Sequence, residues 1–376
     1  MQVGIADVLF LFHIDAMEFD QIIDKARRKG RGAGFNPANR FDRLETRFEP
    51  DGWDREEDLP PLRTVVTDER PRKVITRNAS PDLSFDRSIN PYRGCEHGCI
   101  YCFARPSHAY LGLSPGLDFE TRLIARRDAP AVLTKELSRR GYDVQPIAIG
   151  TNTDPYQPVE KDRQIMRGLL QVLRDFRHPV GIVTKGTLIE RDIDLIADLA
   201  GQGLAKVGVS VTTLDSGLAR AMEPRVPSPA RRLKTIERLA AAGIPVRLMA
   251  SPIVPGLTDP EIERIVTAGA EAGAVAASMI ALRLPLEVAP LFRSWLEEHV
   301  PLRAARVMAR VREMHGGEDY SAEWGTRLTG TGIYADLLQQ RFRRAVRAAG
   351  LGHRMPALRT DLFRVPPRPG DQLSLF

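Results

Sequence analysis

From about residue 86 to residue 281, short apolar runs alternate with segments of helical period. Buried strands separated by amphipathic helices predict βαβ units and a parallel sheet. The expected strands are 86–93, 146–150, 180–184, 206–211, 246–250 and 274–281, and the expected helices are 131–140, 162–177, 191–202, 229–242 and 260–272. Six such units form a partial barrel, open on one side, with its chemistry at the C-terminal ends of the strands.

Composition limits the class of protein. The chain has 376 residues, 54 Lys and Arg, 48 Asp and Glu, and 43% hydrophobic residues. This length allows one large α/β domain with appendages or two domains, and the mixed composition excludes a wholly disordered or fibrous protein. The net charge of +6 favours polyanionic partners only weakly, and genome bias explains an Arg-rich chain equally well.

The N-terminal residues do not have the pattern of an export signal. The apolar run 8–12 is short, has no basic lead and lies between Asp7 and Asp15. A start at Met17 is an alternative. Without an export signal, we expect a cytoplasmic protein. No run of about 18 apolar residues occurs, so we expect no membrane span.

The expected organisation has four parts. Residues 1–85 read as a charged, loop-rich arm whose basic run, 25–31, is predicted to be solvated rather than a dedicated nucleic-acid contact. Residues 86–285 form the barrel, and 286–363 a helical extension. The arginines of its last helix are read as a solvated face or a phosphate-binding patch; they are Arg341, Arg343, Arg344 and Arg347. Residues 364–376 are a Pro-rich linker and tail.

All three cysteines lie within eight residues. Cys95, Cys99 and Cys102 have the spacing C-x3-C-x2-C, so three thiolates on one loop can converge on a single centre. Thiolates favour zinc or iron–sulfur clusters. A zinc site can recruit His97, although closed zinc sites usually draw ligand pairs from two segments. An iron–sulfur cluster held by three thiolates leaves one iron open to a substrate or cofactor.

This loop, with an aromatic residue before its last cysteine, resembles the signature of the radical S-adenosylmethionine (SAM) superfamily. The longer run 90–105 is similar to the spore photoproduct lyase-like branch, and the resemblance covers roughly residues 70–350. It implies an α/β fold, a partial (β/α)6 radical SAM barrel with an N-terminal charged arm and a helical C-terminal extension. It also implies that the three cysteines hold a [4Fe–4S] cluster, that SAM binds the open iron, and that a donor such as a flavodoxin or ferredoxin supplies the electron. Cleavage of SAM then gives a 5′-deoxyadenosyl radical that abstracts a hydrogen atom from the substrate.

The resemblance also implies positions for SAM contacts. The loop after one strand is expected to hold the SAM amino group, and the ends of the next strands are expected to line the same rim. These residues are Thr151, Asn152, Thr153, Asp154, Thr184, Lys185 and Ser210. Arg225 is the candidate for the SAM carboxylate. The alternatives are an Asx-turn loop without a ligand, and a surface ion pair between Arg225 and Glu223.

One departure from the family concerns the hydrogen donor. Spore photoproduct lyases are expected to use a further cysteine as donor to the repaired thymine, and this chain has no fourth cysteine. This departure argues against dithymine repair itself. Tyr101 and Tyr156 are the candidate catalytic residues in its place, with ring packing as the alternative role.

The last five residues, Gln372, Leu373, Ser374, Leu375 and Phe376, resemble the bacterial sliding-clamp-binding pentapeptide Q-L-x-L-F. The resemblance implies the sliding clamp as a partner and nucleic acid as the substrate, with DNA repair or nucleic-acid modification as the role. Two alternatives stay open. One is a radical SAM enzyme acting on RNA, protein or a small molecule; the other is a non-catalytic, clamp-tethered metal-binding module.

Overall fold

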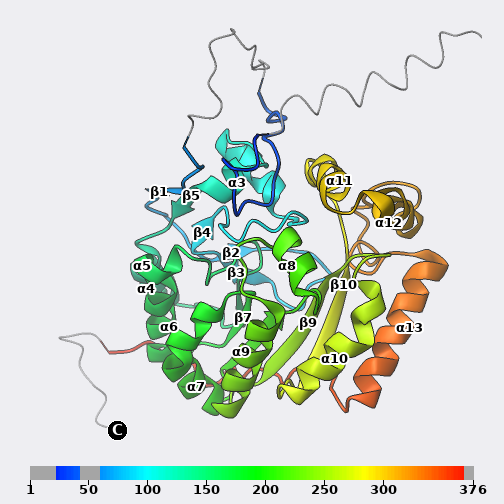
Figure 1. Ribbon diagram of the computed structural model, residues 1–376. Coiled ribbons are helices and arrows are strands. Elements are labelled where there is room, and N and C mark those ends of the chain that lie inside the picture. The colour runs from blue at the N-terminus through cyan, green and yellow to red at the C-terminus, as the bar shows by residue number, and fades with distance from the viewer. Residues whose placement is uncertain (1–22, 43–59, 368–376) are drawn as a thin grey trace, which may run out of the picture.

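The computed structural model describes residues 23–42 and 60–367, and its centre is a sheet with six neighbouring parallel strands (Figure 1). The strand order is β10-β9-β8-β7-β6-β3-β2, and only β2 runs antiparallel to its neighbour. The bounds are β2 Thr76–Arg77, β3 Arg87–Ile89, β6 Ile147–Ile149, β7 Val180–Thr184, β8 Ala205–Ser210, β9 Val246–Ile253 and β10 Ala276–Ala281. Because β2 and β10 remain as edges, the barrel is partial, and the predicted α/β fold is confirmed.

A row of helices covers the outer face of this sheet (Figure 1). They are α4 Ala129–Leu137, α6 Ile165–Asp175, α7 Ile193–Gly201, α9 Pro229–Ala241, α10 Ile262–Glu271 and α13 Gly332–Ala348. The helix α13 packs on α10 and β10, so it takes the place of the sixth barrel helix although it follows two helices of the extension. Those two, α11 Val288–His299 and α12 Pro301–Met314, lie above the C-terminal end of the sheet. Shorter elements are α3 Asp118–Thr121, α5 Glu160–Arg163, α8 Ser216–Met222, and the 3-10 turns η2 Arg105–Leu111, η3 Thr187–Asp192 and η4 Asp259–Glu261.

Local sequence explains where these helices form. The helix α9 begins with Pro229 in its first turn, and the Ser228 hydroxyl accepts a hydrogen bond from the Arg231 amide. In α6, Ile165, Met166, Leu169, Leu170 and Leu173 are buried at three- and four-residue spacing, which places one apolar face against the sheet. No helix in the described ranges is both long and apolar enough to cross a membrane.

The strand predicted over residues 86–93 divides in two. Its first half is β3, in the main sheet, and its second half is β4 (Tyr92–Arg93), which joins β1 (Val65–Asp68) and β5 (Arg122–Ala125) in a small second sheet. Pro91 lies at the break, where it has no amide hydrogen for a sheet ladder. The break turns the chain away from the barrel just before the cysteine loop.

The expectation of a solvated basic run is wrong for two of its arginines. Arg28 and Arg31 are buried. Arg28 donates to Glu298 of α11 with an N–O distance of 2.8 Å, and Arg31 donates to the Glu120 carbonyl at 2.9 Å. The following Ala33 and Phe35 pack in an apolar cluster with α11 and the cysteine loop. Residues 23–42 are therefore part of the folded body, held by contacts that lie far away in the sequence.

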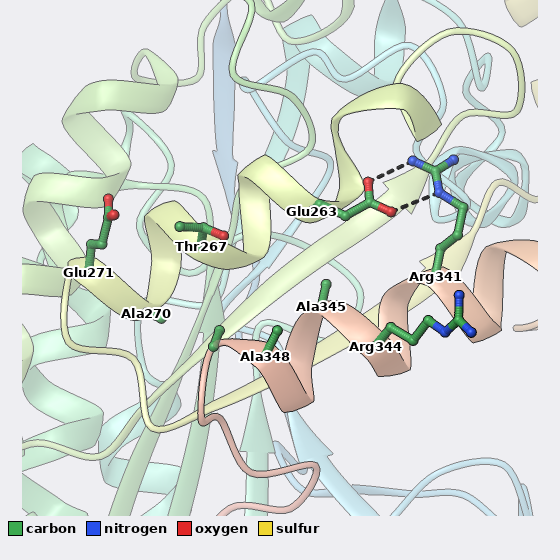
Figure 2. Close-up of a pocket in the computed structure, with 9 residues that line it drawn as sticks. Glu263, Thr267, Ala270, Glu271, Arg341, Arg344, Ala345 and Ala348 are labelled. Carbon is green, nitrogen blue, oxygen red and sulfur yellow. Dashed lines mark hydrogen bonds and ion pairs between the residues drawn. The ribbon is translucent and has the colours of Figure 1, made fainter.

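The arginines of α13 do not all face solvent unpaired. Arg341 donates through Nε and Nη2 to the two carboxylate oxygens of Glu263, at 2.8 and 2.6 Å, and this pair bridges α13 and α10 (Figure 2). Arg344 lines the shallow groove between the same helices. Arg341 thus has a local structural partner, which supports the solvated-face reading over a phosphate-binding patch.

The core also holds a neutral histidine. The ring of His178 is fully buried, with Nδ1 3.0 Å from the Pro179 carbonyl oxygen and Nε2 3.0 Å from the Tyr142 hydroxyl. A neutral ring satisfies both contacts, because Nδ1–H donates to the carbonyl and Nε2 accepts from the hydroxyl. Burial lowers the pKa of His178 to about 4.

This histidine gives the free energy of unfolding a pH dependence. The unfolded chain takes up a proton at an ordinary pKa near 6.5, whereas the folded chain resists protonation until about pH 4. Stability is therefore fully present above pH 6.5 and is lost as the pH falls towards 4, by about 2 kcal/mol between pH 7 and 5. Urea unfolding at both pH values should show a smaller pH-dependent loss in His178→Phe than in wild type. Equal losses in the two proteins would contradict this assignment.

Candidate cluster and cofactor site

The cysteine loop follows β4 and turns above the C-terminal end of the main sheet. Gly94 and Gly98 have φ of +77° and +65°, in the left-handed region that glycine adopts without strain. A Cβ at Gly98 would lie 2.7 Å from a Glu120 carboxylate oxygen. Both glycines are therefore required by the conformation of the loop and by its close packing.

A buried arginine supports the loop from one side. Arg105 has no exposed surface, and its guanidinium donates to the Cys99 carbonyl at 2.9 Å and to the Gly116 carbonyl at 2.9 Å. The same group pairs with the buried Glu120 at 2.5 Å. Glu120 in turn accepts from the backbone amides of Gly32 and Ala33, at 2.9 and 2.8 Å. The Cys99 backbone is thus fixed by groups from three separate segments.

The three cysteines are reduced and lie in a mostly apolar setting. Burial raises the pKa of each of the three thiols, and the negative charges of neighbouring thiolates add to the rise for Cys95 and Cys99. Three thiolates this close are stable only beside a positive centre, so the donor set fits an iron–sulfur cluster. Burial of the loop also suits a group that must be shielded from water.

A single zinc ion fits this loop less well. In the described residues, no set of three or more His, Cys, Asp and Glu side chains is placed to hold one metal ion. In a four-iron cluster each thiolate binds a different iron, so its cysteines need not converge on a single point. His97, the possible fourth zinc ligand, instead has Nδ1 3.3 Å from an Asp154 carboxylate oxygen.

The loop after β6 is ordered by its own polar groups. Asp154 accepts from the Thr184 hydroxyl and the Lys185 amide, both at 2.6 Å, and from the Tyr156 amide at 2.9 Å. Burial alone would raise the pKa of Asp154, but His97 and these donors hold it below its usual value. The Asx turn considered from the sequence is present. Asp154, Thr184 and Lys185, predicted to share a rim, do lie together.

The other residues of this loop are held by Asn90. The Asn90 side-chain oxygen accepts from the amides of Asn152 and Thr153, at 3.1 and 3.4 Å. The Thr153 hydroxyl donates to the Tyr92 carbonyl at 3.0 Å. Thr151 and Asn152 line a cavity of about 550 Å³ beside the loop.

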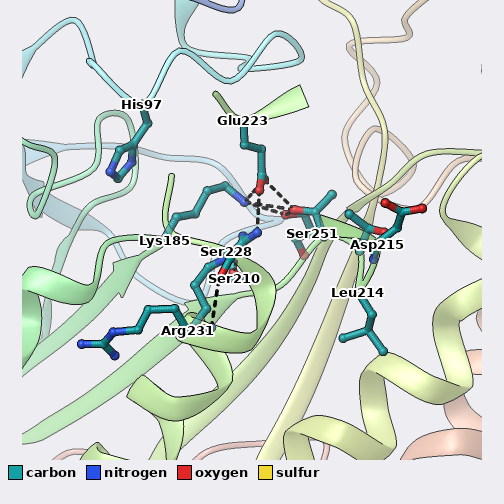
Figure 3. A network of polar contacts seen from close by, with 12 residues as sticks. His97, Lys185, Ser210, Leu214, Asp215, Glu223, Ser228, Arg231 and Ser251 are labelled. Carbon is teal, nitrogen blue, oxygen red and sulfur yellow. Dashed lines mark hydrogen bonds and ion pairs between the residues drawn. The ribbon is translucent and has the colours of Figure 1, made fainter. Parts of the chain in front are cut away.

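A second buried carboxylate organises the rim of the barrel (Figure 3). Glu223 is 1% exposed; Arg232 donates to it at 2.7 Å, Lys185 Nζ lies 3.1 Å away, and the hydroxyls of Thr212 (2.8 Å) and Tyr101 also donate to it. Burial opposes the charged form, but Arg232 and Lys185 outweigh it and hold the pKa of Glu223 well below its usual range. Tyr101 is therefore held by the same network as Lys185.

Sequence reasoning missed the role of Arg232. It lies on α9 among the buried residues Pro229, Ile236 and Leu239, at three- and four-residue spacing. An arginine on the apolar face of a helix signals a buried partner, and here the partners are Glu223 and the Ser210 carbonyl, which accepts at 2.9 Å. Ser210 itself is buried at the end of β8.

Two predicted residues have other neighbours than expected. Arg225 pairs with Glu96 at 2.8 Å and not with Glu223, the partner considered as the alternative to SAM, because Arg232 pairs with Glu223. Tyr156 is 2% exposed in the main core, and the carboxylates nearest its hydroxyl are those of Asp192 and Glu160. That placement favours the packing role of Tyr156.

Comparison with known proteins gives the class of the chain. Residues 89–268 match the family model of the radical SAM superfamily. The chain is 38% identical over 235 residues to an uncharacterized protein of Mycobacterium tuberculosis, covering 62% of this chain and 68% of the relative. The chain therefore belongs to the radical SAM superfamily.

Further similarities are more distant. An uncharacterized protein of Methanocaldococcus jannaschii is 28% identical over 173 residues, which is 46% of this chain and 62% of that protein. Among solved structures, a single-site mutant of spore photoproduct lyase matches with a TM-score of 0.53 at 17% identity, covering 77% of this chain and 80% of that one. Spore photoproduct lyase complexed with dinucleoside spore photoproduct matches with the same TM-score at 16% identity, covering 76% and 80%. These structures share the fold of this chain.

The Glu223 network predicts a large effect on stability. Glu223→Gln leaves Arg232 and Lys185 without their shared carboxylate in a buried setting, and breaking a buried pair in this way costs about 3–5 kcal/mol. Glu263→Gln, which breaks the partly exposed pair with Arg341, is the matched control and should cost less than about 1 kcal/mol. Urea unfolding measures both changes. Similar losses in the two variants would show that the Glu223 network does not stabilise the rim.

Proposed function

We propose that this chain is a radical SAM enzyme that binds a [4Fe–4S] cluster through Cys95, Cys99 and Cys102 and acts on nucleic acid. The observation that carries the proposal is the buried loop with all three cysteines at the C-terminal end of six parallel strands. When bound, the reduced cluster and SAM supply a 5′-deoxyadenosyl radical that takes a hydrogen atom from the substrate. The protein orients the reactants and excludes water.

SAM is proposed to bind between the cysteine loop and the strand ends. The residues proposed to line this site are the segment 151–154, which follows β6, and Thr184, Lys185 and Ser210, which lie at the C-terminal ends of β7 and β8. The carboxylate oxygens of Asp154 already accept hydrogen bonds from neighbouring groups. We therefore propose that Asp154 positions Lys185 and its own loop. Arg225 is proposed for the SAM carboxylate, since its partly exposed guanidinium lies beside Glu96 in the cysteine loop.

Tyr101 is the stronger of the two tyrosines proposed as catalytic. Its hydroxyl donates to Glu223 and lies 3.3 Å from the Thr212 hydroxyl oxygen. It is adjacent to Cys102, whereas the Tyr156 hydroxyl faces carboxylates in the core. With no cysteine outside the loop, the hydrogen donor to the substrate must be another group.

The choice of nucleic acid rests on two supports. A protein of the same fold is known in complex with dinucleoside spore photoproduct, and the cavity beside the cysteine loop is lined by four arginines. A base inside a duplex cannot enter such a cavity, so we propose that the target base is extruded or already single-stranded.

We also propose two protein partners, a bacterial sliding clamp and an electron donor. Gln372–Phe376, the proposed contact with a bacterial sliding clamp, lies outside the described residues. A flavodoxin or ferredoxin is the proposed electron donor. Binding to the clamp would place the enzyme on replicating DNA, in agreement with a repair role.

The cluster assignment is tested by one substitution. Cys99→Ala removes a thiolate from the only cysteine loop of the chain, so the anaerobically reconstituted protein should lose its iron and sulfide and cleave no SAM. His97→Gln is the control, since His97 faces Asp154 and should be dispensable for holding iron. Zinc in the wild-type protein, lost in both variants, would identify a Cys3His zinc site instead.

The substrate class is tested by isotope transfer. Reconstituted protein, SAM and a strong reductant are incubated with deuterated single-stranded DNA, and 5′-deoxyadenosine is analysed by mass spectrometry. Deuterium in this product is expected, because the radical takes its hydrogen atom from the substrate. Unlabelled 5′-deoxyadenosine with DNA, but labelled product with deuterated RNA or peptide, would replace DNA by that substrate.

A further inference from the structure

The cavity beside the cysteine loop lies at the open side of the barrel. It is lined by residues of β2 and β3 at one edge of the sheet and by Arg283, which follows β10 at the other edge. Four of its lining residues are arginines, namely Arg93, Arg126, Arg283 and Arg327, and no Asp or Glu lines it. The cavity therefore collects positive charge at the one place where the strands do not close.

Three of these arginines have carboxylate partners outside the cavity. Arg93 and Arg126 share Glu69, at 3.1 and 3.2 Å, and Arg327 pairs with Asp82 at 2.6 Å. In the parts of the chain that the structure describes, no carboxylate pairs with Arg283, and its polar neighbour is the neutral hydroxyl of Tyr320. Two carboxylates thus compensate the charge of four guanidinium groups only in part, and Arg283 is the group without a paired carboxylate.

Arg283 is held in a defined orientation. Its guanidinium carbon lies 4.0 Å from the centre of the Phe103 ring, which is the residue after Cys102. Burial lowers the pKa of Arg283, as expected for a cation removed from water without a full partner. Burying such a cation costs free energy unless an anion pairs with it. The Phe103 ring holds the planar guanidinium in an orientation that suits a bound anion.

We propose that Arg283 binds a phosphate group of the substrate in this cavity. A guanidinium binds phosphate through two parallel hydrogen bonds, and the aromatic walls formed by Tyr92, Phe85 and Phe103 suit a planar base. The position next to Cys102 places the bound nucleotide beside the cluster loop. This inference rests on the proposed action on nucleic acid and names the residue that recognises the backbone of that substrate.

The test compares a charged ligand with its neutral isostere. Reconstituted protein with SAM is titrated calorimetrically with thymidylyl-(3′→5′)-thymidine and with its uncharged methylphosphonate analogue. Wild type should bind the charged ligand at least tenfold more tightly, and Arg283→Gln should abolish that preference while keeping its affinity for SAM. Arg303→Gln, at an exposed position of α12, is the control and should behave as wild type.

Each contrary result has a separate meaning. Equal binding of the charged ligand by wild type and Arg283→Gln would overturn the role of Arg283 and leave action on nucleic acid standing. A parallel loss of SAM affinity in Arg283→Gln would overturn the inference by assigning this arginine to the SAM carboxylate. Inorganic phosphate that binds as tightly as the dinucleotide would overturn it in favour of a free-phosphate site. Failure of wild type to bind either dinucleotide would overturn both this inference and the proposed substrate class.

Discussion

The buried ion pair between Arg105 and Glu120 is the contact on which the cysteine loop depends. Both side chains are fully buried, so each charge is tolerable only because the other is present. Arg105 also donates to the Gly98 and Cys99 carbonyls of the loop and to the Gly116 carbonyl, and Glu120 accepts from the amides of residues 32 and 33. One charge pair thereby fastens the N-terminal segment, the loop and η2 to each other.

Glu223 plays the corresponding part on the barrel side of the loop. It joins Arg232 of α9 to Lys185 at the end of β7, and it receives the Tyr101 hydroxyl from the cysteine loop itself. The loop is therefore held between two carboxylates that belong to different parts of the fold. A rigid loop keeps the three thiols in fixed relative positions. Fixed positions suit the proposed cluster, because its reaction needs a defined distance to the substrate.

The extent of successful sequence prediction follows the range of the interactions. The parallel strands were predictable because each is a local apolar run, and the cysteine loop because its ligands are neighbours in the chain. Arg31 and Glu120, in contrast, are 89 residues apart, and the local sequence around either residue does not predict their contact. The strand over 86–93 was expected whole because apolar periodicity does not show that its halves enter different sheets. A pair between Arg225 and Glu223 was considered as an alternative because the two are neighbours in sequence, whereas Arg232 approaches that carboxylate from the apolar face of a helix.

Their carboxylate partners distinguish several arginines that build the fold from Arg283. Arg105, Arg232 and Arg28 are buried against carboxylates, so their charges are already compensated. Arg283 is also largely shielded from water, yet in the described residues its neighbours are the face of the Phe103 ring and the neutral side chain of Tyr320, and no carboxylate pairs with it. A ring face and a neutral hydroxyl attract a cation but do not neutralise its charge. Since burying an uncompensated charge is costly, this position makes physical sense when an anion enters the cavity, at the open edge of the barrel and beside the residue that follows the last cysteine.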